Sequence, residues 1–192
     1  IAEVSGKVNY LHPQLRKGNI MSAGTEVLSI DDKDYVLALK QAEADLVKNQ
    51  ASLKELRLKV KDTQESLKLA QEKLSLGRTE LSRIERLVKK SSASQSQFDS
   101  QRSSVLQLKQ EAQSLNNQLE TLPAQIQVQE AQIDIAKAQV ETQENNLART
   151  SIALPFNARI IDVNIEENQF ITQGSSLFTA QTIDKVLVNA QF

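Results

Sequence analysis

Two long stretches of the chain repeat an apolar residue at every seventh position. The first series runs through Leu39, Leu46, Leu53, Val60, Leu67, Leu74, Leu81 and Val88. The second runs through Phe98, Val105, Ala112, Leu119, Ile126, Ile133, Val140 and Leu147. Smaller or mixed residues lie three positions after the members of each series. Unbroken heptads of this length are typical of coiled-coil helices, so the pattern predicts two long helices.

The two series are separated by a segment without large apolar residues. Residues 89–96, KKSSASQS, include four serines, and Ser94 suits the N-cap of the second helix. Because the link is short, we expect the helices to be antiparallel, each about 55 residues and about 80 Å long. In the expected register Leu74 faces Leu108 and Asn49 faces Ile133, so that an apolar residue meets each polar residue of the seam. Pro123 is expected to remove one helical hydrogen bond and to bend the second helix.

The two ends of the chain follow a different pattern. Short alternating or β-branched runs, separated by turn residues, predict strands on both sides of the helices. These runs are GKVNYL, TEVLSI, RIIDVNI, SSLFTA and KVLVNAQF. The middle of the chain holds one glycine and one proline, which suits long helices. We therefore divide the chain into residues 1–33, a helical hairpin over 34–149 with its turn near 89–95, and residues 150–184.

The two flanking segments contain the same seven-residue phrase. GNIMSAG at 18–24 aligns with NQFITQG at 168–174, and apolar residues follow both copies. Gly18 aligns with Asn168, and these two residue types tolerate positive φ in turns best. Two copies separated by one long insertion indicate two halves of a single small fold. The predicted fold class is α+β, with a long antiparallel two-helix coiled-coil hairpin inserted into a split β-sandwich.

Composition excludes several classes of function. The formal net charge is −1, which gives no reason to expect nucleic acid as a partner. There is no cysteine, so disulfides and thiolate metal sites are excluded. We find no Ser/His/Asp grouping, phosphate-binding loop or pair of carboxylates in a plausible cleft, and we expect no catalysis and no cofactor. Both ends of the chain are interpreted as lying inside a longer protein.

Three polar features invite a sharper interpretation. His12 is the only histidine, and a metal site is not expected around it. The acidic run at 31–34, DDKD, lacks the spaced ligands of a calcium loop and is interpreted as an N-terminal helix cap. Lys33 follows SIDD, which is similar to the hairpin where carrier domains attach lipoate. We interpret it as a solvated lysine at the helix entrance, because the long insertion leaves from this point.

These segments together resemble the periplasmic adaptor, or membrane fusion protein, family (HlyD-like) of tripartite efflux pumps and type I secretion systems. The split fold resembles the two halves of a lipoyl or biotinyl carrier domain, which gives the predicted sandwich its lipoyl-like character. SGKV with GNIMSAGTEVLSID is similar to the first half in that family. LARTSIALPFNARI is similar to the family phrase that ends in Ala-Pro-Phe-Asp-Gly. Here Leu154, Asn157 and Ala158 replace its Ala, Asp and Gly.

A third resemblance lies at the predicted hairpin turn. Adaptors that dock on an outer-membrane exit duct of the TolC kind share an Arg, Leu and Ser at fixed spacing. RIERLVKKSSAS supplies Arg83, Leu87 and Ser94 at that spacing, and Asp99 also fits. The resemblance therefore implies a partner-docking tip formed by Arg83, Leu87 and Ser94. Spacing alone also allows a simpler interpretation, in which Leu87 packs beside the seam and Arg83 is a solvated residue.

The resemblance implies a function, partners and a location. It implies an adaptor that links an inner-membrane transporter (RND, ABC or MFS type) to an outer-membrane TolC-like duct, assembled from six copies. It implies the periplasm, an inner-membrane anchor outside this chain, and a β-barrel domain into which residues 185–192 would lead. Two alternatives stay open. One is a coiled-coil tether without a duct partner, and the other is a lipoyl or biotinyl carrier domain with an inserted arm.

Overall fold

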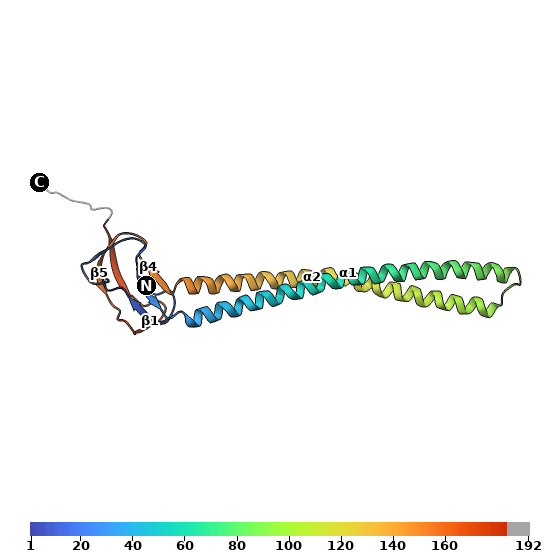
Figure 1. The fold of residues 1–192 in the computed structure, drawn as a ribbon, viewed down its shortest axis with the longest axis horizontal. Coiled ribbons are helices and arrows are strands. Elements are labelled where there is room, and N and C mark those ends of the chain that lie inside the picture. Colours follow the sequence, from blue (N-terminus) through green and yellow to red (C-terminus); the bar gives the residue numbers. More distant parts are fainter. Residues whose placement is uncertain (184–192) are drawn as a thin grey trace. The chain divides into compact units, whose positions relative to one another are not determined.

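A computed structural model describes residues 1–183 of the chain, which form two compact units. The first, Ile1–Asp45 with Ala136–Phe192, holds every strand found in residues 1–183 and the bases of both helices, and we call it the β unit. The second, Leu46–Ile135, holds the rest of both helices and the turn between them, and we call it the hairpin unit. Figure 1 labels the main elements. The expected lead into a barrel at residues 185–192 lies outside the described residues.

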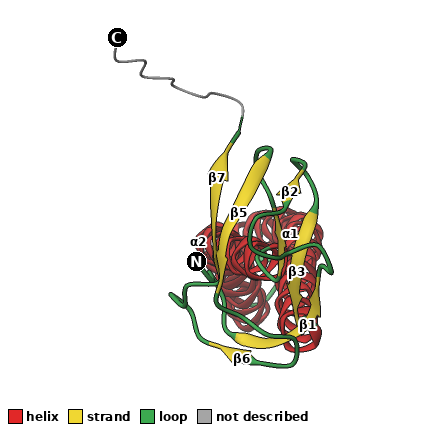
Figure 2. Ribbon diagram, turned by 90° about the vertical axis from the view of Figure 1, so that its left-hand side faces the viewer, coloured by secondary structure: helices red, strands yellow, loops and turns green. Residues whose placement is uncertain are grey.

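The β unit contains short strands arranged in two sheets (Figure 2). The strands are β1 (Gly6–Leu11), β2 (Ile20–Met21), β3 (Glu26–Ile30), β4 (Ser151–Ala153), β5 (Ala158–Val163), β6 (Phe170–Ile171) and β7 (Phe178–Thr182). One sheet has the order β4-β3-β1-β6, and the other has the order β2-β5-β7. The GKVNYL run is β1, whereas the KVLVNAQF run lies beyond residue 183 and is not described.

Each sheet combines strands from both ends of the chain. β3 pairs with β4, β1 pairs with β6, and β2 pairs with β5, all antiparallel. Each of these pairs joins a strand from before the helices to a strand from after them. Neither half therefore completes its backbone hydrogen bonds alone, and the predicted fold, a β-sandwich split by a helical hairpin, is confirmed.

The repeated phrase forms the same turn in both halves. Gly18 has φ 91° and Asn168 has φ 70°, so the aligned Gly and Asn both occupy the left-handed region. The Gly18 N–H donates to the Ile160 carbonyl at 2.8 Å, and the Asn168 N–H donates to the Val8 carbonyl at 2.9 Å. Each turn thus bonds to the long strand of the opposite half. The two copies of the repeated phrase therefore link the halves through reciprocal backbone hydrogen bonds.

Two apolar clusters form the core of the β unit. Neighbouring residues of a strand point to opposite faces of the sheet, and Val27 and Leu28 of β3 accordingly contribute one to each cluster. Both are 0% exposed. Leu28 shares its cluster with Leu177, and Val27 shares its cluster with Ile160. Burying each such side chain contributes about 1.5–3 kcal/mol, and both clusters contain residues from the two halves.

The helices follow the heptad pattern. Helix α1 is Lys33–Lys89 and α2 is Gln95–Ala148, and α2 continues through Pro123. Within the hairpin unit, Leu67, Ala70 and Leu74 of α1 pack with Val105 and Ala112 of α2, and Leu108 packs against this cluster as expected. Within residues 1–183, no helix has an apolar stretch long enough to cross a membrane.

Polar residues of the seam are hydrogen-bonded across it. The Gln129 side-chain amide donates to the Asn49 carbonyl and to its Oδ1, both at 3.1 Å. Asn49 is therefore hydrogen-bonded to Gln129, which lies one helical turn before Ile133 on α2. The Gln101 amide likewise donates to the Gly77 carbonyl at 3.3 Å. These hydrogen bonds give half-buried amides of the seam a partner within it.

Candidate functional site

The hairpin tip begins where α1 ends in a hydrogen-bonded turn. The Ser92 N–H donates to the Leu87 carbonyl at 2.8 Å, and the Ser91 N–H donates to the Val88 carbonyl at 2.9 Å. Ser91 has φ 56°, in the left-handed region. These bonds and this φ define a Schellman motif, with Ser91 in the position that glycine usually occupies. The end of α1 is thereby closed immediately after Lys89.

The start of α2 is closed by a capping box. The Gln97 N–H donates to Ser94 Oγ at 3.2 Å, and the Ser94 N–H donates to Gln97 Oε1 at 3.0 Å. This reciprocal pair satisfies two backbone donors that the helix itself leaves without partners. The prediction that Ser94 is the N-cap is confirmed. The link between the helices is thus held at both ends by its own backbone and by Ser94.

The three predicted tip residues lie on both sides of this link. Arg83 and Leu87 are one helical turn apart on α1, and so lie on one face of that helix. Leu87 is half-buried, whereas Arg83 and Ser94 are exposed. The Leu87 carbonyl accepts from Lys90 and Ser92, so closure of the turn fixes the backbone at Leu87. Asp99 lies on the first turns of α2, where its Oδ1 accepts from the Gln95 amide at 3.2 Å.

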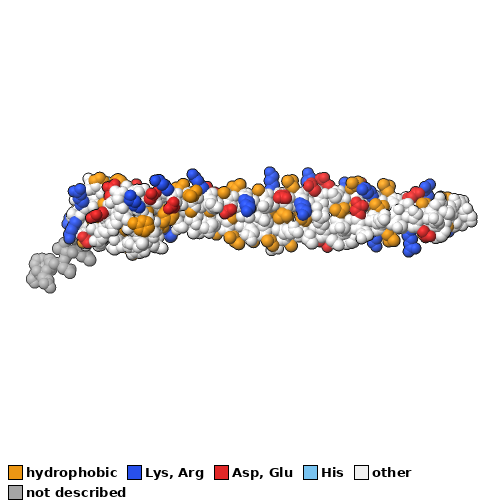
Figure 3. Space-filling model, turned by 90° about the horizontal axis from the view of Figure 1, so that it is seen from below, with side chains coloured by type: hydrophobic (Ala, Val, Ile, Leu, Met, Phe, Trp, Pro, Cys, Tyr) orange, Lys and Arg blue, Asp and Glu red, His pale blue; other side chains and the backbone are white. Residues whose placement is uncertain are grey.

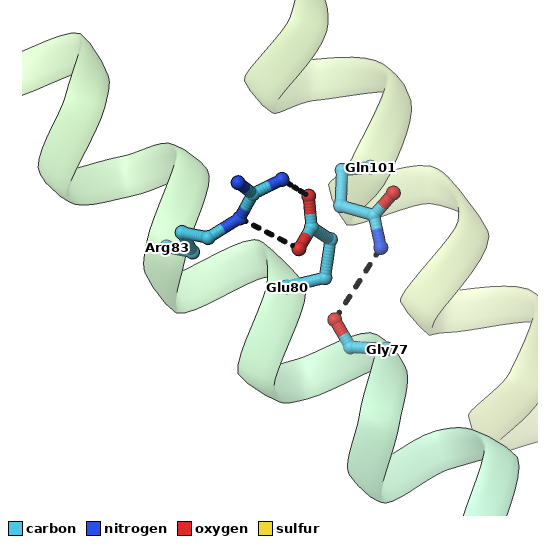
Figure 4. Close-up of polar contacts among 4 residues, drawn as sticks. All are labelled: Gly77, Glu80, Arg83 and Gln101. Carbon is cyan, nitrogen blue, oxygen red and sulfur yellow. Dashed lines mark hydrogen bonds and ion pairs between the residues drawn. The ribbon is translucent and has the colours of Figure 1, made fainter.

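Glu80 holds Arg83 and was not among the predicted site residues. Arg83 Nε donates to Glu80 Oε2 at 2.9 Å, and Nη2 donates to Oε1 at 2.6 Å (Figure 4). The hydrogen bond from Arg83 lowers the pKa of Glu80 below its ordinary value, and the same bond raises the pKa of Arg83. The sequence signal was available, since an acid three residues before an arginine is a standard helical ion pair.

A second ion pair lies closer to the end of α1. Lys89 Nζ is 2.8 Å from Glu85 Oε1, and the hydrogen bond from Lys89 lowers the pKa of Glu85. Arg86 Nε donates to the Ser82 carbonyl at 3.3 Å. Both ion pairs join residues of the same helix, α1.

The remaining sequence candidates have structural roles. Lys33 is the first residue of α1; its N–H donates to Asp31 Oδ1 at 3.3 Å, which confirms the helix-cap interpretation of residues 31–34. The Lys33 side chain is 84% exposed and lies 4.0 Å from the Asp31 carboxylate. His12 Nδ1 accepts the Gln14 N–H at 3.2 Å. In residues 1–183, no three His, Asp or Glu side chains gather where they could hold a metal ion.

Proteins of known structure share this architecture. MacA from Actinobacillus actinomycetemcomitans superposes with a TM-score of 0.57 at 20% identity, over 96% of this chain and 48% of that protein. A candidate efflux transporter from Bacteroides eggerthii superposes with a TM-score of 0.54 at 16% identity, over 96% of this chain and 39% of that protein. Several other solved structures similar to this chain are described as membrane fusion or periplasmic adaptor proteins. The chain has the periplasmic adaptor fold.

At these identities the similarity establishes the fold alone. No family model matches the sequence, and no curated protein matches it. The chain spans less than half the length of either protein with which it superposes. The resemblance inferred from SGKV, GNIMSAGTEVLSID and LARTSIALPFNARI is confirmed at the level of this adaptor fold. The Asn157 that replaces the family's Asp accepts the Ala23 N–H at 2.9 Å, as a carboxylate could.

Proposed function

We propose that this chain is the hairpin and lipoyl-like part of a periplasmic adaptor that links an inner-membrane transporter to an outer-membrane exit duct of the TolC kind. The hairpin tip is the observation that carries this proposal. Its link is closed at both ends by hydrogen bonds, and it presents Arg83, Leu87 and Ser94 next to that link. A tip that is ordered before binding loses less conformational entropy when it docks.

Each tip residue has a distinct role in the proposed docking. Leu87, already fixed at its backbone, inserts into a groove between duct helices, where its burial contributes about 2 kcal/mol per copy. Glu80 accepts from two of the five Arg83 N–H groups. The other N–H groups donate to carbonyl or carboxylate oxygens at the end of the duct. Ser94 keeps its hydroxyl on the α2 cap and so holds the link in shape.

The rest of the assignment follows from the same adaptor role. The protein is not an enzyme, acts in the periplasm, is anchored to the inner membrane by a segment outside this chain, and assembles from six copies with an RND, ABC or MFS transporter. A carrier role for Lys33 is disfavoured, because this residue opens a helix rather than a tight, exposed turn between strands. Mass spectrometry of the native protein should find Lys33 unmodified.

The substitution Leu87→Asp tests the docking role. A carboxylate buried without a partner at the duct is costly, and the cost recurs in every copy. Export by the complete pump and capture of the duct should each fall at least tenfold, while helicity and expression are unchanged. Leu37→Asp is the matched control, because Leu37 is 65% exposed on α1 within the β unit and should leave export normal.

Two outcomes would contradict the proposal. Normal export and normal duct capture by Leu87→Asp would remove the tip from the mechanism and favour a tether without a duct partner. A lipoyl or biotinyl mass on Lys33 would instead favour a carrier domain. Loss of helicity in the variant is checked by circular dichroism, and Leu87→Ala then repeats the test with a smaller change.

A further inference from the structure

The hairpin tip carries an excess of positive charge that the three docking residues alone do not explain. Residues 83–102 contain five basic and two acidic residues, a net charge of +3, whereas the whole chain has a net charge of −1. Figure 3 shows Lys and Arg side chains among those exposed near the turn end of the hairpin unit. A local excess of positive charge on a nearly neutral chain attracts a partner of negative charge.

Two of these basic side chains have no acidic partner. Arg83 and Lys89 are held by the ion pairs described above. Arg86 Nε donates to the Ser82 carbonyl, which is neutral and leaves the Nη groups of Arg86 for other acceptors. Both Arg86 and Lys90 are exposed, and neither forms an ion pair within residues 1–183. Their charges are therefore available to a partner.

The two cations lie on the same face of the hairpin as the docking residues. Positions 83, 86, 87 and 90 are spaced i, i+3, i+4 and i+7, which covers about 100° of a helix surface. Helix α1 ends at Lys89, and the Lys90 N–H donates to the Leu87 carbonyl at 3.1 Å, so Lys90 follows one turn beyond Leu87. We call Arg83, Arg86 and Lys90 the basic flank. Leu87 is the one apolar residue among them.

The link beyond the basic flank adds neither charge nor a large apolar side chain. Residues 91–97, SSASQSQ, are small or neutral and polar. Asp99 is the first acidic residue of α2, and its Oδ1 already accepts from the Gln95 amide at 3.2 Å. Recognition at the tip therefore depends on one apolar residue, Leu87, and on the positive charge around it.

We propose that Arg86 and Lys90 determine the specificity of the docking tip, by selecting a duct end at which carboxylates surround an apolar groove. Leu87 enters the groove, and the basic flank lies over its acidic rim. The inference rests on the proposed docking function and names the chemistry of the partner. Charges at the rim of an interface change the association rate and its salt dependence more than the dissociation rate. The basic flank therefore attracts the duct before Leu87 is buried.

A variant that combines Arg86→Gln with Lys90→Gln tests this role in the complete adaptor. Its binding to the purified TolC-like duct of the same cells is followed by surface plasmon resonance. The salt concentrations are about 0.01 M and about 0.15 M, which screen charges over about 30 Å and about 8 Å. The native protein should associate about tenfold faster at the lower salt, and the variant should lose most of this increase. The dissociation rate should be nearly the same for both proteins.

Two further variants separate charge from packing. Lys48→Gln combined with Lys54→Gln removes the same charge from exposed positions of α1, roughly 50 Å along the helix from the tip, and should associate like the native protein. Leu87→Ala should instead dissociate faster and keep the salt dependence. Its failure to do so would contradict the docking function itself, whereas the basic flank is judged by the association rates.

Three results would overturn the proposal. The first is an unchanged association rate in the Arg86 and Lys90 variant together with faster dissociation of Leu87→Ala, which leaves docking standing without the basic flank. If thermal stability also falls, the two cations serve the dipole of α1 instead. The second is an equal loss of rate in the Lys48 and Lys54 variant.

The third result is salt-dependent binding of the native protein to phosphatidylglycerol vesicles but not to the duct, which would assign the basic flank to an anionic lipid surface. Circular dichroism checks that the double variant is folded. If it loses helicity, Lys90→Gln alone repeats the test, because Lys90 lies outside α1. This single variant should lose a smaller part of the salt-dependent rate, and an unchanged rate rejects the proposal in the same way.

Discussion

At the scale of single residues, Arg83 shows how a flexible side chain becomes a defined donor. Glu80 engages two of its five N–H groups, both along the Nε–Nη2 edge. The edge formed by Nη1 and Nη2 keeps its donors for another acceptor. The guanidinium is therefore held by Glu80 while it still presents a forked pair of donors. Lysine could not reproduce this, because its ammonium group is a point charge without a second edge.

The Glu80–Arg83 ion pair can be followed through the pKa of Glu80. Hydrogen bonding to Arg83 depresses the pKa of Glu80 below its ordinary value of 4.5. The interaction is therefore fully present at pH values above the ordinary pKa and is lost as the pH falls through the lower, folded value.

Arg83→Gln should return the Glu80 pKa towards 4.5, as followed by NMR of the side-chain carboxyl. Glu85, whose partner is Lys89, is the internal control and should keep its lowered pKa. An unchanged Glu80 titration in Arg83→Gln would show that the pair does not persist in solution.

At the scale of elements, the heptads predicted the two helices, but they could not predict every contact between them. A period of seven shows which face of a helix is buried, yet either of two successive turns can supply the partner of a given side chain. Asn49 illustrates this: the pattern placed it opposite Ile133, and its side chain accepts a hydrogen bond from Gln129, one turn away on the same helix. The cap at Ser94 was predictable from its residue type. The Schellman turn was not, because Ser91 stands where a glycine would have given the signal.

A double-mutant cycle at Asn49 and Gln129 tests this seam contact. Either single substitution to leucine leaves a half-buried amide without that partner, whereas the double substitution replaces the pair by apolar packing. We expect a coupling free energy of about 0.5–1.5 kcal/mol from chemical unfolding of the four proteins. The control cycle combines Asn49→Leu with Gln101→Leu, which bonds Gly77 far along the seam and should be additive. Additive effects at Asn49 and Gln129 as well would mean that the hydrogen bonds contribute no net stability.

At the scale of the whole molecule, the repeated phrase carried the most information. It predicted that the chain ends form one fold, and β1–β6, β2–β5 and β3–β4 each join the two ends. The order of the strands could not be predicted in the same way. β2 and β6 are two residues long, too short for any alternation to be recognised, and the reciprocal bonds of Gly18 and Asn168 hold them in place. The strand order is therefore determined by backbone hydrogen bonds in the turns, which the pattern of side chains does not reveal.

This reciprocity predicts how the β unit behaves when the chain is cut. Replacing residues 46–135 by a short glycine-containing turn should leave a chain that still folds, because both apolar clusters and all the cross-half strand pairs are kept. Residues 1–45 alone should not fold, since Leu28 then has no Leu177 to pack against and β1 has no β6 to pair with. Thermal unfolding followed by circular dichroism should show a cooperative transition for the joined chain and no transition for residues 1–45.

In the joined chain, Leu28→Ala should cost about 2–5 kcal/mol of unfolding free energy, as for other buried leucines. Cooperative unfolding of residues 1–45 alone would show that the first half is a domain by itself, and the repeat would then need a different explanation.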